Sequence, residues 1–181
     1  MRGLVRAKAM TTGVNLRNLG YYWGVLGVIA LIASAVFRLT PRMLVLEPAT
    51  FGLAHWMLLL LFTPYMAYAE GYKGFHRNFA PRVVARALFL REHGTISQLL
   101  LAPLFCMGFI HATRRRRLIS LVVTGGIVLL VLLVSQMPQP WRGLIDAGVI
   151  TGLMLGVASL CWYGWRATFQ DARPAIALDL P

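Results

Sequence analysis

The sequence has few acidic residues and few charged residues of any kind. Only 6 of its 181 residues are Asp or Glu, against 18 Lys or Arg; charged residues make up 13% of the chain and hydrophobic residues 58%. A typical soluble domain carries about 25% charged residues. The composition therefore excludes an ordinary soluble domain and predicts one all-α integral membrane domain over residues 1–181.

Motifs for catalysis, metal binding and nucleotide binding are also missing. Cys106 and Cys161 lie in apolar runs without a CxxC or Cys/His spacing, which predicts small buried hydrophobes and no metal site. The GYKGF segment at 71–75 is too short for a nucleotide fingerprint, which needs a preceding strand. No spacing links a nucleophile to a base, so the sequence favours a protein that is not an enzyme.

Long apolar runs are what the sequence does contain. Four of them predict transmembrane helices, because each approaches the roughly 20 residues that cross a bilayer. Pro64 predicts a kink in the second run, since proline removes one helical hydrogen bond. The four expected spans are residues 20–37, 51–69, 118–134 and 144–165.

Two further segments decide the topology. Residues 81–93 predict a helix lying in the plane of the headgroups, and residues 96–112 form an apolar run with Pro103 near its middle. If that run turns back or lies along the surface, the four-span chain places 15 basic residues inside and 3 outside, with both termini cytoplasmic. A fifth span would divide them ten to eight. Positive residues favour the cytoplasmic side, so we expect four spans, with five as the alternative.

Basic clusters at the ends of the apolar runs predict contact with anionic lipid headgroups rather than nucleic acid, since no nucleic-acid recognition motif accompanies them. Arginine outnumbers lysine sixteen to two, which suggests a GC-rich genome. The expected location is a bacterial inner membrane. Glycines every four residues in the last span predict close helix packing. The expected headgroup ligands are Arg82, Arg86, Arg114, Arg115, Arg116 and Arg117, and the expected packing glycines are Gly148, Gly152 and Gly156.

Four polar residues in or beside the apolar runs are candidates for chemistry. His55 and His111 are possible axial ligands of a b-type haem in the five-span arrangement. Asp146 and Glu70 are possible members of a proton or transport path, because an ionisable group at membrane depth is costly. The simpler alternatives are packing histidines, an Asp146–Arg142 pair and a Glu70 pair with a nearby cation.

Three functions follow from these observations. The first is a non-enzymatic accessory, assembly or scaffold protein of a bacterial inner-membrane complex, working with other membrane subunits or with a second copy of itself. The second is a small transporter or channel component, and the third is a haem-binding electron-transfer subunit.

Overall fold

Three helices of the computed structural model are long and apolar enough to cross a membrane. They lie in α1 (Arg2–Leu44), where the apolar part is Asn18–Leu44, in α6 (Arg114–Ser135) and in α7 (Trp141–Phe169). The structure describes residues 2–170, 173–176 and 178, with backbone only up to residue 17, and this part of the chain contains no strand. The chain is therefore an all-helical membrane protein.

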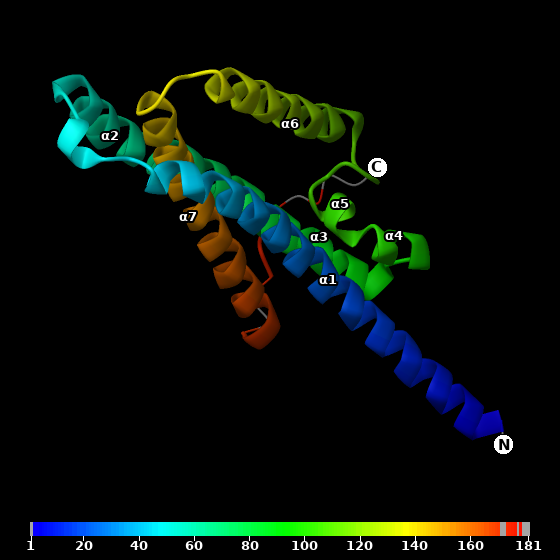
Figure 1. Cartoon of the computed structure of the whole chain (residues 1–181). Helices are drawn as coiled ribbons and strands as arrows, with labels where there is room; N and C mark the ends of the chain where they lie inside the picture. The colour runs from blue at the N-terminus through cyan, green and yellow to red at the C-terminus, as the bar shows by residue number, and fades with distance from the viewer. Residues whose placement is uncertain (1, 171–172, 177, 179–181) are drawn as a thin grey trace.

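The second predicted span is the beginning of a longer helical rod. After a 3₁₀ turn, η1 (Pro48–Thr50), α2 (Leu53–Met66) runs directly into the π-helix η2 (Ala67–Phe79) and then α3 (Ala80–His93) (Figure 1). With 14 residues, α2 alone is about 21 Å long, too short to cross the roughly 30 Å hydrocarbon core. The four-span bundle is thus supported by three of its helices.

α1, α7 and the rod from α2 to α3 form the central bundle. The Tyr21 hydroxyl donates to the Gly164 carbonyl at 3.2 Å, while Gly143, at the other end of α7, packs against the Arg42 carbonyl, so α1 and α7 are antiparallel. The rod runs parallel to α7, because Gly148 faces Phe62 and Gly156 faces Phe75. The ends of α1, α2 and α7 near Arg42 therefore share one face of the molecule.

The tightest packing lies where α3 meets α1, α5 and α7. Val83, Val84, Ala87 and Leu90 of α3 are completely buried in this core. The helix expected over residues 81–93 is present as α3, where it continues the rod and packs on several sides. Its place relative to the headgroups stays a prediction. Its apolar residues face neighbouring helices, and those neighbours were not visible in its own sequence pattern.

The apolar run 96–112 does not form one helix. It is divided into α4 (Ile96–Leu100) and α5 (Ala102–Cys106), followed by an irregular segment in which His111 has a positive φ of 47°. Each helix of five residues is about 7.5 Å long, so neither forms the fifth span of the alternative topology. α4 and α5 lie on α1, where Gly24 and Gly27 leave room for Cys106 and Pro103.

α6 stands apart from the bundle, as Figure 1 shows. Ser120 is its only buried residue, and its hydroxyl donates to the Met107 carbonyl at 3.1 Å. No heavy atom of the described chain lies within 4 Å of where a Cβ would stand on Gly125 or Gly126. The apolar middle of α6 is therefore not covered by the described part of this chain.

Candidate functional site

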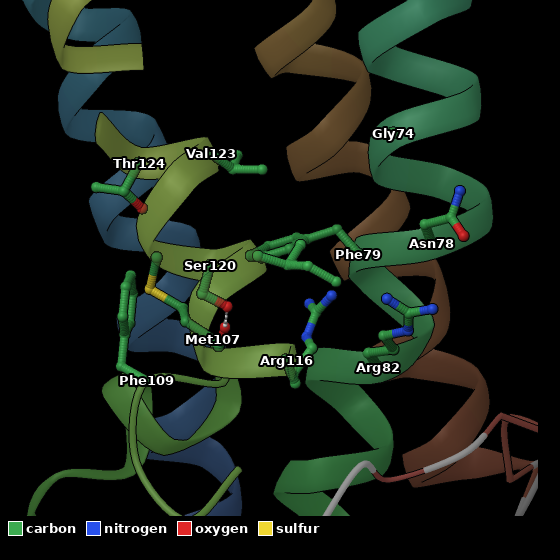
Figure 2. Close-up of a pocket in the computed structure, with 11 residues that line it drawn as sticks. Gly74, Asn78, Phe79, Arg82, Met107, Phe109, Arg116, Ser120, Val123 and Thr124 are labelled. Carbon is green, nitrogen blue, oxygen red and sulfur yellow. Dashed lines mark hydrogen bonds between the residues drawn. The ribbon is translucent and has the colours of Figure 1, made fainter. Parts of the chain in front are cut away.

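A basic pocket lies between the rod and the first turns of α6. It has a volume of about 180 Å³, and Figure 2 shows Arg82 and Asn78 on one wall and Arg116 and Ser120 on the other. The rest of the lining comes from the rod, from the segment between α5 and α6, and from α6: Gly74 and Phe79, Met107 and Phe109, and Ile119, Val123 and Thr124. The eleven described lining residues include two guanidinium groups and no carboxylate.

Arg82 has a side-chain donor that makes no hydrogen bond to the described residues. Its Nε is buried and has no hydrogen-bond partner among the described residues. Beside it, the Asn78 side chain is tied back to the Lys73 carbonyl, to which its Nδ2 donates at 2.6 Å. A buried donor without a partner costs free energy, and an acceptor entering the pocket would remove that cost.

Arg86, one turn further along α3, is in a different situation. Its side chain is 3% exposed, and its guanidinium donates to the carbonyls of Phe105, Leu178, Ile110 and His111 over distances of 2.7 to 2.9 Å. The same group stacks over the Phe105 ring, 4.4 Å from its centre. Arg86 therefore joins α3 to the segment around α5 and to the C-terminal segment, and the headgroup contact expected for it stays a prediction.

The four consecutive arginines form the first turn of α6. Thr113 caps the helix by accepting a hydrogen bond from the Arg116 backbone N–H at 3.4 Å. Arg114, Arg115 and Arg117 are exposed, while Arg116 is half-buried and lines the pocket. The structure thus brings Arg82 and Arg116 to one pocket and leaves the other three at the surface.

The glycine series of α7 faces the rod. Gly148, Gly152 and Gly156 are buried, and the side chains opposite them are Phe62, Glu70 and Phe75 in turn. A Cβ on any of the three would lie within 3.3 Å of a side-chain atom of the rod. Small residues at this spacing let two helices approach closely, which is how these three act here.

Asp146 lies inside the bundle near the end of α7 that adjoins Arg42. It is 4% exposed, and its Oδ2 has no hydrogen-bond partner among the described residues. Arg42 and Arg142 both attract its charge, but neither forms an ion pair with it within 4.0 Å. Arg142 instead donates to the Ser135 carbonyl at 2.9 Å, so the expected Asp146–Arg142 pair does not form.

Glu70 and His76 lie further along the same seam between η2 and α7. Glu70 packs against Gly152 and forms no ion pair with a described Lys or Arg. The Ser159 hydroxyl has one proton, which it donates to the Leu155 carbonyl at 2.7 Å. His76 Nδ1, 3.1 Å from the same hydroxyl oxygen, is therefore the donor in their hydrogen bond.

The two histidines proposed for haem are held at different places. His55, at the start of α2, accepts a hydrogen bond from the Gly52 N–H at 3.1 Å and stacks 4.5 Å from the Trp141 ring. His111 lies beside α3, where its carbonyl accepts from Arg86. Two axial ligands must reach one iron atom, and the structure does not bring these imidazoles together.

Comparison with known proteins gave no match, whether to a family model, to a curated protein or to a solved structure.

Sequence reasoning missed the polar groups that join the arginines in the pocket. A signal for them exists on α6, because Arg116, Ser120 and Thr124 recur every four residues and share one face of an otherwise apolar helix. Asn78 had no such signal. The π-helical backbone of η2, which sets its position, pairs residues five apart and is not encoded by a simple periodicity.

Proposed function

We propose that this protein is a non-enzymatic accessory, assembly or scaffold subunit of a bacterial inner-membrane complex, in which α6 contacts a helix of a partner subunit. The observation that carries the proposal is the pair Gly125–Gly126 in the middle of α6. Each glycine in a helix costs about 1 kcal/mol relative to alanine. No described contact within the chain accounts for that cost, since nothing lies within 4 Å of either position.

Exposure of apolar residues alone does not indicate a partner, because lipid covers them equally well. Small residues do indicate one, since helix–helix contacts in membranes are enriched in glycine, alanine, serine and threonine. Here Thr124, Gly125 and Gly126 are consecutive, with Ser120 one turn earlier. A partner helix packed there would approach the α6 backbone as closely as the rod approaches the glycines of α7.

We place one boundary of the hydrocarbon core at the face where α1 and α6 end and α2 and α7 begin. About 20 residues along each helix cross the hydrocarbon core. Counted from Leu44, Leu53, Ser135 and Trp141, the opposite boundary then falls near Gly24, Tyr72, Arg116 and Leu160 in the described chain. In this arrangement α2 and the start of η2 complete the fourth span together.

Charge gives the orientation. Arg38, Arg42 and Arg142 adjoin the shared face, and the four arginines that begin α6 adjoin the opposite one. The face with the greater number of basic residues is cytoplasmic by the positive-inside rule. Both termini and the basic pocket then lie on the cytoplasmic side.

A photo-cross-linking amino acid at Leu129 tests the proposal, because this position lies one turn beyond Gly125 and Gly126 on an exposed part of α6. The expected result in intact cells is a protein adduct whose identity matches a subunit that co-purifies in mild detergent. Met154, exposed on α7, is the control position and should give lipid adducts. Lipid adducts alone at Leu129, with no stoichiometric partner, would overturn the proposal.

A second candidate function is a small transporter or channel component. It is favoured by Asp146, a carboxylate inside the bundle with one unpaired oxygen, because such groups in membrane helices commonly mark ion or proton paths. Glu70 lies further along the same helix seam. Asp146→Asn keeps the shape of the side chain and removes its charge, so unchanged growth and unchanged ion flux in that variant would remove this candidate.

A further inference from the structure

We propose that the basic pocket between the rod and α6 binds the phosphate group of an anionic phospholipid from the cytoplasmic leaflet. Arg82 and Asn78 on the rod, with Arg116 and Ser120 on α6, would surround the phosphate. The acyl chains would lie along the apolar surface of α6. The lining of this site does not include Gly125 or Gly126, where the partner contact is proposed.

The chemistry of the lining matches a phosphate diester. Guanidinium groups are the preferred protein partners of phosphate, since they donate several hydrogen bonds as well as a charge. Arg82 offers a buried Nε without a described partner, and none of the described lining residues is a carboxylate. Arg86 on the same helix shows the contrast, because its donors are already occupied by carbonyl oxygens.

The size and polarity of the pocket match an amphipathic ligand rather than a soluble one. Its volume of about 180 Å³ is below the roughly 300 to 1,000 Å³ of pockets that enclose a whole small molecule, so it suits a headgroup fragment. Ile119 and Val123 line it on α6, and the exposed apolar side chains of that helix continue beyond Val123. A phosphate held at Arg82 would therefore leave its chains next to an apolar surface.

The pocket also lies at the right depth. The cytoplasmic boundary inferred above falls near Tyr72 and Arg116, and the lining residues of the rod begin at Gly74. Basic pockets between transmembrane helices on the cytoplasmic side are known places for anionic headgroups. The depth of the pocket and its basic lining thus both suit an anionic headgroup.

The test uses the full chain, delipidated in detergent and titrated with phosphatidylglycerol or with phosphatidylcholine, with bound lipid counted by native mass spectrometry. Phosphatidylglycerol should bind at least about tenfold more tightly than phosphatidylcholine, and Arg82→Gln should remove about tenfold of that affinity by losing one charged partner. Arg91→Gln, an equal charge change at an exposed position of α3, should alter it by less than about twofold.

Three results would overturn the proposal. Equal binding of the two lipids would exclude an anion site. Equal losses in Arg82→Gln and Arg91→Gln would assign binding to the general surface charge. Displacement of phosphatidylglycerol by inorganic phosphate at millimolar concentration would make the ligand a soluble phosphate rather than a lipid.

Asn78→Asp decides the matter if Arg82→Gln does not fold. Asn78 is exposed and bonds only locally, so its replacement should preserve the thermal midpoint. It places a carboxylate in the pocket and should weaken phosphatidylglycerol binding at least as much as Arg82→Gln. Ser97→Asp, at an exposed position of α4, is the matched control and should leave phosphatidylglycerol binding unchanged. Unchanged binding in folded Asn78→Asp would refute the pocket assignment.

Discussion

Gly156→Ala should destabilise the isolated chain, although alanine is the better helix former. A Cβ at this position would stand 2.7 Å from Phe75 Cγ and 2.8 Å from Phe75 Cδ1, where ordinary contacts are 3.4 Å or more. These atoms belong to the root and side of an aromatic ring, so no flexible end can simply move aside. Either the ring must rotate or η2 must separate from α7.

The magnitude follows from two opposed effects. Overpacking a core typically costs 1 to 3 kcal/mol, and replacing a helical glycine by alanine gains about 1 kcal/mol. Gly125→Ala isolates the second effect, because Gly125 lies in a helix of the same protein and no described heavy atom lies within 4 Å of the added Cβ. We therefore expect Gly156→Ala to be less stable than Gly125→Ala by about 1 to 3 kcal/mol.

Unfolding by sodium dodecyl sulfate in mixed micelles, followed by tryptophan fluorescence, measures this difference directly. Gly125→Ala should match or exceed the unsubstituted protein, and Gly156→Ala should unfold at a lower detergent mole fraction. If the two variants unfold together, the close approach of η2 to α7 at Gly156 is refuted.

Three further predictions concern the part of the molecule around α3, α4 and α5. Arg86→Ala takes the side-chain donor away from four carbonyls, one in a buried and three in part-buried hydrogen bonds, and should cost at least about 3 kcal/mol while exposing the segment around Leu178 to protease. Arg91→Ala, at an exposed position, should change stability by less than about 0.5 kcal/mol. Burial raises the pKa of the Cys106 thiol to about 12, so this thiol should stay unmodified by maleimide at pH 8 until the protein is denatured, and modification of the folded protein would contradict its burial. In a cysteine-free background, Ser97→Cys and Thr113→Cys should resist an impermeant thiol reagent in intact cells while Gln136→Cys reacts, and labelling at Thr113 from outside would refute the orientation.

Hydropathy alone was enough to predict the long helices α1, α6 and α7, because each contains an apolar stretch long enough to cross a membrane. It was also enough to predict the glycine face of α7, since the spacing of four keeps Gly148, Gly152 and Gly156 on one side of any helix. Both predictions depend on local periodicity and need no knowledge of a neighbour.

The part of the molecule around α3, α4 and α5 was predicted less well for a physical reason. The role of Arg86 depends on carbonyls that lie 19 to 92 residues away along the chain, and no local pattern encodes them. The packing of α3 also depends on distant segments. Its own sequence predicts a membrane-facing apolar side, because the pattern does not show that α1, α5 and α7 cover these residues. A run such as 96–112 can be helical by composition and still be divided, because its partners on α1 are glycines that admit a close, irregular approach.

The two proposals meet on α6, and together they make a last prediction. α6 is anchored near Met107 by Ser120 and joins α7 through a short connection, so the angle between α6 and the bundle depends on what lies between them. A lipid phosphate bridging Arg82 and Arg116 would fix that angle and present Gly125 and Gly126 to a partner in one orientation. Binding of lipid and of partner should then be coupled, since each favours the same position of α6. Arg82→Gln should accordingly reduce the protein adduct formed from Leu129 while Arg91→Gln leaves it intact, and an equal adduct yield in both variants would show that the two sites act separately.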